Sequence, residues 1–99
     1  MIVVAGEIKL APESAAAARA AAITMGRDTR AEPGCVTYRF YEDLEERGHF
    51  HVFEIWETAE ALKAHFETPH MKAFRATLGT LKFISREITR YEVSKAERI

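Results

Sequence analysis

The chain has 99 residues, of which 47% are hydrophobic and 29% charged, and its formal net charge is -1. This length predicts one domain, residues 1–99, with a thin core that association with a second copy would extend. The lack of a run rich in Lys and Arg argues against nucleic acid as a partner. The single cysteine, Cys35, excludes an internal disulfide and fits a reducing compartment.

The N-terminal segment Ile2–Leu10 alternates between two sets of side chains, which predicts a strand. Gly6 and Glu7 interrupt its apolar run, and no basic segment precedes it. We therefore expect neither a signal peptide nor a membrane span, and the expected location is the cytoplasm.

A long helix is predicted next. Pro12 suits the first helical turn, and Glu13 lies beside it where the helix dipole favours an acid. The alanine-rich sequence has high helix propensity to about Arg30. The segment Glu-Pro-Gly at 32–34 is expected to end the helix.

Two further strands are predicted at Cys35–Glu42 and His49–Trp56, joined by a polar hairpin loop that ends in Gly48. Both strands carry large apolar side chains on both faces. In the first strand the two sets are Val36, Tyr38 and Phe40 against Cys35 and Tyr41. In the second they are Phe50, Val52 and Trp56 against Phe53 and Ile55. Helices can cover only one sheet face, so we expect a second copy of the chain to cover the other.

The C-terminal half is predicted to contain a broken helix and a last strand. Thr58 is a suitable N-cap for a short helix to about Phe66, and Thr68 is one for a second helix that begins at Pro69. The second helix is expected to end near residue 78, followed by a strand at 81–93 and a loose tail at 93–99. This order predicts an α+β fold of the ferredoxin-like βαββαβ type, an antiparallel sheet with helices on one face.

Two segments, EPGCVTY at 32–38 and FEIWETAEALKAHFETPHMKAF at 53–74, resemble the antibiotic biosynthesis monooxygenase (ABM) family. The closest likeness is to its quinol monooxygenase branch. The stretch from Trp56 to Phe74 is the most specific part. With the order of strands and helices, the resemblance extends to about Val93.

The resemblance implies a homodimer whose two sheets pack face to face as a dimeric α+β barrel, with a pocket in each subunit between sheet and helices. Members with known activity oxidise quinols or polycyclic phenols with O₂ and use no flavin, haem or metal, so no cofactor is expected. The family is mixed. Some members degrade haem, others oxidise aldehydes or lipids, and many have no known activity.

The haem-degrading branch is marked by an Asn on the first strand, a Trp on the second helix and a haem-ligating His. This chain has Gly6, His65 and Arg75 at those places, and it contains no Asn. Haem degradation is therefore not expected.

His65 and His70 are the most informative polar residues. His65 follows Ala61 and Leu62 on the inward face of its helix. It is either a core histidine satisfied by one hydrogen bond, or a neutral imidazole at a pocket wall that exchanges a proton near pH 7. His70 lies in the first turn of the next helix. It could orient a substrate oxygen or satisfy backbone groups at the helix break.

No metal site is predicted. Zinc motifs on helices place two histidines at i and i+4, whereas His65 and His70 are five residues apart across a helix break. His49 and His51 share one face of a strand but lie at a hairpin end, where solvation is expected. Cys35 has no basic neighbour that would make it a nucleophile.

We therefore expect a cofactor-independent monooxygenase that forms a homodimer and oxidises a small aromatic substrate with O₂. His65 would be the base, with Tyr38 and His70 as hydrogen-bonding groups. The candidate substrate-binding residues are Trp56, His70, Phe53, Met71 and Phe74. The alternative is a non-catalytic dimeric barrel that binds a small ligand or acts in a stress response. An enclosed pocket with His65 or Tyr38 pointing inward would favour the enzyme.

Overall fold

The computed structural model describes residues 1–99. A short 3₁₀ turn at Pro12–Ser14 precedes the first α-helix. The helices and strands, in chain order, are β1 (Ile2–Leu10), α1 (Ala15–Arg30), β2 (Cys35–Glu42), β3 (His49–Trp56), α2 (Ala59–Phe66), α3 (Pro69–Leu78) and β4 (Phe83–Glu92).

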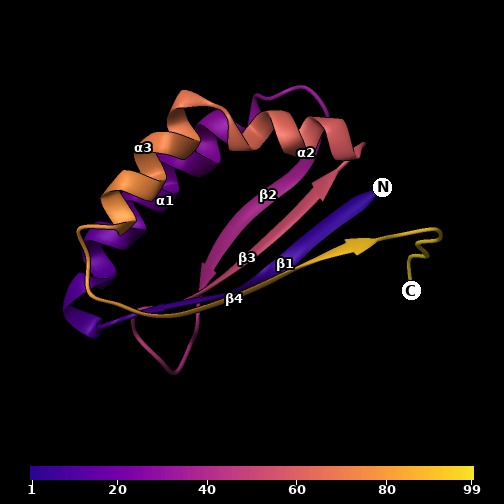
Figure 1. The fold of residues 1–99 in the computed structure, drawn as a ribbon. Coiled ribbons are helices and arrows are strands. Elements are labelled where there is room, and N and C mark those ends of the chain that lie inside the picture. Colours follow the sequence, from indigo (N-terminus) through magenta and orange to yellow (C-terminus); the bar gives the residue numbers. More distant parts are fainter.

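The four strands form one antiparallel sheet in the order β2-β3-β1-β4. The helices lie over one face of this sheet, and the other face is bare (Figure 1). This arrangement confirms the ferredoxin-like α+β fold that the order of elements predicted. None of the helices combines the length and the apolar character needed to cross a bilayer.

The core lies between the inner face of the sheet and the helices. Alternate residues of β1 and β3 point into it, because side chains of a strand alternate between faces. The largest fully buried side chains in the core include Trp56 from β3, Met25 from α1 and Leu62 from α2. Phe74 joins the same cluster from α3.

The start of β2 differs from the strict alternation that we predicted. Cys35 pairs with Trp56 and Thr37 pairs with Ile55, so the register shifts between the two pairs. This irregularity adds one residue to β2, which reverses the alternation there. As a result Cys35 packs against the core and Val36 is 54% exposed, the opposite of the predicted faces.

The helix break between α2 and α3 follows the predicted chemistry. Thr68 precedes Pro69, and its side chain accepts a hydrogen bond from the backbone N–H of Met71 at 3.2 Å. The Thr68 hydroxyl in turn donates to the carbonyl oxygen of His65 at 2.8 Å. One side chain thus caps α3 and holds the end of α2 beside it.

The last strand begins at Phe83, two residues after the predicted start, and ends at Glu92. The backbone N–H of Val93 donates to the carbonyl oxygen of Met1 at 2.9 Å, so the ladder extends past the strand. The residues from 94 to 99 are exposed.

Candidate functional site

A pocket of about 680 Å³ lies between the inner face of the sheet and helix α3. Hydrophobic side chains make up 13 of its 17 lining residues. Met25, Met71 and Phe74 reach it from the helices, and Val4 and Ile88 reach it from β1 and β4. Its size and apolar walls are typical of sites that bind a small organic molecule.

Two polar side chains lie on the sheet side of this pocket. Tyr38 on β2 and Glu54 on β3 are directly opposite each other in the strand register, and both line the pocket. They are 2% and 6% exposed. The other ionisable side chains of the lining are Arg75 and Arg86. Glu54 is thus the one carboxyl group that faces the cavity.

Glu54 has an unusual environment for an acid. Burial raises the pKa of Glu54 to about 7, although the hydrogen bond from Trp56 Nε1 to Glu54 Oε1, 2.8 Å long, stabilises the carboxylate. A carboxyl group with this pKa gains and loses a proton near neutral pH, as a general base requires.

Tyr38 is the neutral partner of this pair. Burial, assisted by the negative charge of Glu54, raises the pKa of Tyr38 well above its ordinary value. The one hydrogen-bond partner of its hydroxyl is the sulfur of Met25, at 3.9 Å, which is a weak acceptor. The hydroxyl can therefore donate to a stronger acceptor on a bound molecule.

A second polar cluster lies at the break between α2 and α3. Nδ1 of His65 and Nε2 of His70 both lie 2.7 Å from the same oxygen of Glu32, Oε2. Burial lowers the pKa of His65, and the hydrogen bond to Glu32 opposes this effect. The His65 ring packs against the rings of Trp56 and Tyr38, with centroids 5.0 and 5.5 Å away.

The structure places the predicted site residues in three different surroundings. Tyr38, Met71 and Phe74 line the pocket. His65 and Trp56 are buried beside it, 1% and 0% exposed, but are not among its lining residues, so of the two alternatives for His65 the structure favours the core histidine.

The remaining two predicted residues lie away from the pocket. His70 stands at the helix break, as expected. Phe53 alternates with Val52 and Glu54 on β3, so its side chain points to the bare face of the sheet and is 38% exposed.

The sequence analysis missed Glu54. The signal was present, because Glu54 occupies an inner-face position between Val52 and Trp56, where a charged side chain interrupts an apolar set. Carboxyl groups are rarely fully buried without a reason. A carboxyl group among apolar residues on the inner face of a strand therefore indicates a candidate functional site.

Two groups of side chains have the donor atoms to hold a metal ion. In the first, Glu32, His65 and His70, the facing imidazole nitrogens already bond to one carboxylate oxygen. The second comprises Glu7, His49 and His51 on the opposite face of the sheet.

Comparison with known sequences finds one family model and several relatives. The model of the family described as "Antibiotic biosynthesis monooxygenase" matches residues 1–77. YcnE of Bacillus subtilis, which carries a provisional monooxygenase name, is 32% identical over 95 residues, 96% of this chain and 100% of that protein. The uncharacterized protein sll1783 of Synechocystis is 37% identical over 98 residues, 99% of this chain and 67% of that protein.

Comparison with solved structures gives the same result. A structure from Deinococcus radiodurans, titled provisionally as an antibiotic biosynthesis monooxygenase, superposes with a TM-score of 0.92 at 31% identity. The match covers 100% of this chain and 98% of that one. Rv0793 of Mycobacterium tuberculosis gives a TM-score of 0.87 at 29% identity and covers 98% of both chains.

Proposed function

Because the chain belongs to the antibiotic biosynthesis monooxygenase family, we propose that it is a cofactor-independent monooxygenase that oxidises a quinol or another electron-rich aromatic compound with O₂. The family match and the monooxygenase names of its relatives support a monooxygenase-like function.

The observation that carries this proposal is the pairing of Glu54 with Tyr38 in an apolar pocket. An acid whose pKa is about 7 can remove a phenolic proton, and a neutral tyrosine can donate a hydrogen bond to the phenolate that results. Apolar walls exclude water, which would otherwise stabilise and protonate the anion. These are the functions that a protein must supply when the substrate itself reduces O₂.

The proposed reaction balances without a reductant or a bound cofactor. The hydroquinone anion gives an electron to O₂, and the two radicals combine at a ring carbon. One oxygen atom replaces a C–H hydrogen and becomes part of a hydroxyquinone, and the other leaves as water. All four electrons that reduce O₂ come from the substrate, and the proton that Glu54 accepted returns to the departing oxygen.

We assign the base to Glu54 and not to His65, which the sequence favoured. Glu54 lines the pocket, whereas His65 contacts the ring of Tyr38 from outside the lining and bonds to Glu32. In this account His65 and His70 hold the helix break and support the position of Tyr38.

The proposal includes a homodimer. The outer face of the sheet, which no helix covers, carries exposed apolar side chains such as Phe53, Tyr41 and Tyr91. Strand β4 is exposed along most of its length although it includes Phe83 and Ile84. A second copy packed on this face would remove these side chains from water.

The test is oxygen consumption by the purified protein with a panel of quinols and polycyclic phenols. We expect at least one substrate to be consumed. The variant Glu54→Gln keeps an acceptor for Trp56 but cannot take a proton, so it should lose roughly 10²- to 10⁴-fold in rate, the usual effect of removing a general base. Glu57→Gln, an exposed acid just after the same strand, is the matched control and should keep full activity.

If the wild type consumes no oxygen with any member of the panel, the proposed activity is refuted. Retained binding of these compounds would then support the non-catalytic alternative, a dimeric barrel that holds a small apolar ligand.

A further inference from the structure

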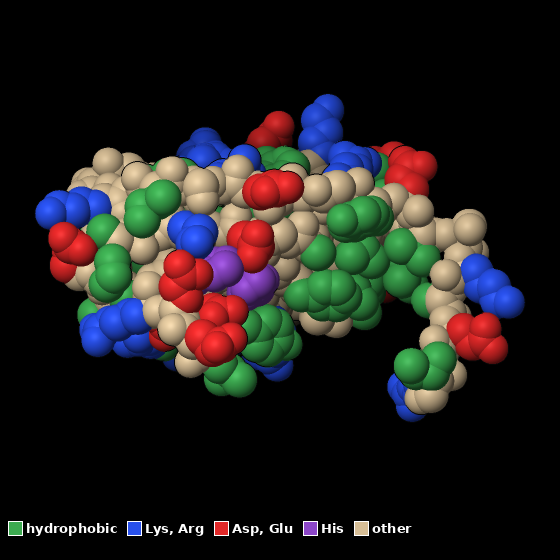
Figure 2. Space-filling view, turned by 90° about the horizontal axis from the view of Figure 1, so that it is seen from below, with side chains coloured by type: hydrophobic (Ala, Val, Ile, Leu, Met, Phe, Trp, Pro, Cys, Tyr) green, Lys and Arg blue, Asp and Glu red, His purple; other side chains and the backbone are tan.

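The outer face of the sheet carries a polar cluster that the proposed oxygenation does not use. Glu7 on β1 and His49 and His51 on β3 make up this cluster, which we call the outer histidine cluster. Glu7 pairs with His51 in the strand register, and His49 lies two residues earlier on the same face. Seen from below the sheet, histidines lie among acidic side chains and border a hydrophobic patch (Figure 2).

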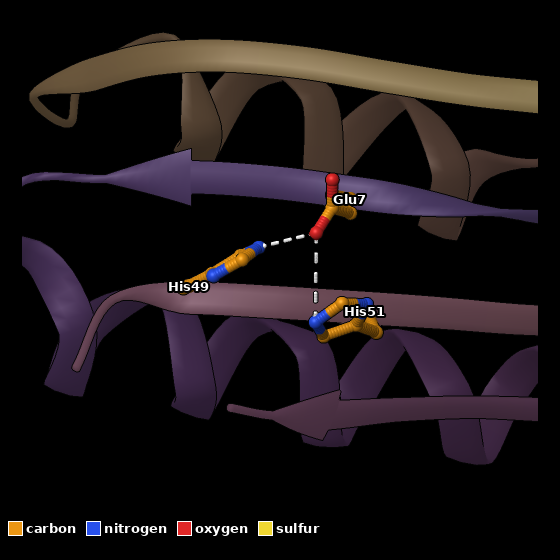
Figure 3. A group of neighbouring side chains, drawn as sticks. All are labelled: Glu7, His49 and His51. Atoms are coloured by element: carbon orange, nitrogen blue, oxygen red, sulfur yellow. Dashed lines mark hydrogen bonds and ion pairs between the residues drawn. The ribbon is translucent and has the colours of Figure 1, made fainter. Parts of the chain in front are cut away.

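The imidazoles of the cluster converge on one oxygen atom. Nε2 of His49 lies 2.7 Å from Oε1 of Glu7, and Nε2 of His51 lies 3.7 Å from the same oxygen (Figure 3). The two rings are 4.7 Å apart between centroids. Two imidazole nitrogens and a carboxylate oxygen that point to a common space are a ligand set for a transition metal ion.

A fourth donor lies close to this set. Oδ1 of Asp43, in the hairpin loop between β2 and β3, is 3.7 Å from Nε2 of His51. Ligands of a tetrahedral zinc ion at bond lengths of 2.0–2.1 Å are separated from each other by about 3.3 Å. The separations of 2.7 and 3.7 Å fall on either side of this value, so rotations of exposed side chains are enough to accommodate an ion.

The other ring nitrogen of His49, Nδ1, also has a carboxylate partner. This atom lies 2.8 Å from Oε2 of Glu46, and Oε1 of Glu46 is held by Nζ of Lys9 at 3.1 Å. In histidine metal sites, a carboxylate that accepts from the other ring nitrogen fixes the tautomer and the orientation of the ligating imidazole. Here Nε2 of His49 points at Oε1 of Glu7, the contact that a bound ion would replace.

The charge around the cluster also favours a cation. Glu7 lies directly opposite Glu87 of β4, and like charges in such a pair destabilise a sheet. Asp43 and Glu46 add two more carboxylates, against which Lys9 supplies one positive charge. A divalent ion at this place would offset the repulsion.

We propose that Glu7, His49 and His51 form a binding site for a divalent transition metal ion of the zinc type, with Asp43 as a fourth ligand. Imidazole donors favour zinc and its neighbours over magnesium and calcium, which prefer oxygen ligands alone. This site departs from the expectation of solvated histidines at the hairpin end. The side chain of His49 is only 13% exposed.

The site is separated from the pocket by the sheet itself. Glu7, His49 and His51 point outward, whereas Tyr38 and Glu54 point inward. The ion therefore joins β1, β3 and the hairpin loop, and it stabilises the fold without taking part in the oxidation.

The experiment is titration of the chelator-treated protein with ZnCl₂ by isothermal calorimetry. We expect one ion per chain with a micromolar or tighter dissociation constant. His49→Gln and His51→Gln should each weaken binding at least 10-fold. Glu46→Gln, which changes the contact behind His49 and the ion pair with Lys9, should weaken it by about 10- to 100-fold. His70→Gln removes a histidine from the other cluster and should leave the affinity unchanged.

Each contrary result overturns the proposal. No binding at millimolar ZnCl₂ would show that the cluster is a set of ion pairs only. Binding that survives both His49→Gln and His51→Gln, or that is lost in His70→Gln, would place the ion elsewhere. Glu46 is exposed and is not one of the proposed ligands, so Glu46→Gln should fold normally. Its zinc affinity therefore provides the test if either histidine variant fails to fold.

Discussion

Glu54 is the residue on which the proposed chemistry depends, and its position follows from the geometry of the strand. It lies between two core residues on β3, and its side chain is buried and lines the pocket. Trp56 reaches back along the same strand to bond to it. The protein thus keeps an ionisable group in an apolar cavity, an arrangement that weakens folding at neutral pH but suits proton transfer.

This arrangement predicts a specific dependence of stability on pH. The pKa of Glu54 is about 7 in the folded protein, against 4.5 for an unperturbed glutamate. Between these values the folded state binds the proton more tightly than the unfolded state, so the stability that the proton provides is lost as pH rises from about 4.5 to about 7. Across this window the stability of Glu54→Gln relative to the wild type should therefore rise by on the order of 3 kcal/mol.

The measurement is urea unfolding of both proteins at several pH values. The contribution of His65, whose pKa burial lowers, has the opposite sign but is present in both proteins and cancels in the difference. Glu57→Gln should follow the wild type at every pH. A difference between Glu54→Gln and wild type that does not change with pH would show that Glu54 is not perturbed.

His65 separates the two assignments of the base. Since the imidazole does not line the pocket, His65→Gln should keep the quinol-dependent rate within about 10-fold, because glutamine can still bond to Glu32. Oxygen uptake by His65→Gln, measured in parallel with Glu54→Gln, decides which residue is the base. If His65→Gln loses as much activity as Glu54→Gln, the base is His65, as the sequence suggested.

The sequence predicted the burial of His65 but not its surroundings. The spacing from Ala61 and Leu62 indicates the inward face of a helix, and His65 is 1% exposed. An inward side chain contacts either a cavity or another side chain, depending on the distance between the sheet and the helices. Sequence periodicity does not encode this distance. The sequence likewise did not indicate that Arg75 lines the pocket. Its Nη2 donates to the carbonyl oxygen of Phe66, another lining residue.

At the scale of elements, strands and helices were predictable because local chemistry and tertiary packing agree. Threonine caps, Pro69 and alternating apolar residues mark boundaries that the structure reproduces within a few residues. The irregularity at the start of β2 was not predictable from alternation, because an added residue changes no composition. Val36 is exposed and Cys35 points inward because the register of β2 against β3 shifts between Cys35 and Thr37.

Gly6 provides a test at this scale. A Cβ atom at Gly6 would lie 2.2 Å from the carbonyl oxygen of Glu87 and 2.4 Å from Cα of Ile88 in β4. These are backbone atoms, so Gly6→Ala should push β1 and β4 apart and reduce the free energy of unfolding by about 3 kcal/mol. Thermal or urea denaturation measures the loss.

Gly79→Ala is the matched control. Its Cβ would meet only ordinary contacts at 3.4 Å, so that variant should be neutral or slightly more stable. If both variants unfold alike, β4 does not approach β1 at Gly6 as the structure shows. The same lack of space means that an Asn, the mark of the haem-degrading branch, would not fit at this position.

At the scale of the whole molecule, the outer face of the sheet divides into two halves. At one end Val3 pairs with Ile55 and Ala5 pairs with Phe53, which gives an apolar surface. At the other end lies the outer histidine cluster. The two halves adjoin, because the exposed Tyr41 lies opposite His51 in the strand register, so a partner copy on the apolar half would stand beside the proposed metal site.

Light scattering should therefore find a dimer, with twice the chain mass of 11.2 kDa, that resists added salt because the contact is apolar. Phe53→Asp should shift the protein toward the monomer. Ile23→Asp changes an apolar side chain on α1 that is 54% exposed, and should leave the dimer intact. A monomeric wild type at micromolar concentration would refute the proposed assembly.

The central claim is that the pocket of Tyr38 and Glu54 inserts one oxygen atom of O₂ into an aromatic substrate without a cofactor. The most direct measurement is the mass of the product formed from a consumed quinol under ¹⁸O₂ in ordinary water. The account predicts one ¹⁸O atom in the hydroxyquinone and the other in water, with formation strongly reduced in Glu54→Gln. A product that carries no ¹⁸O, accompanied by hydrogen peroxide, would contradict it.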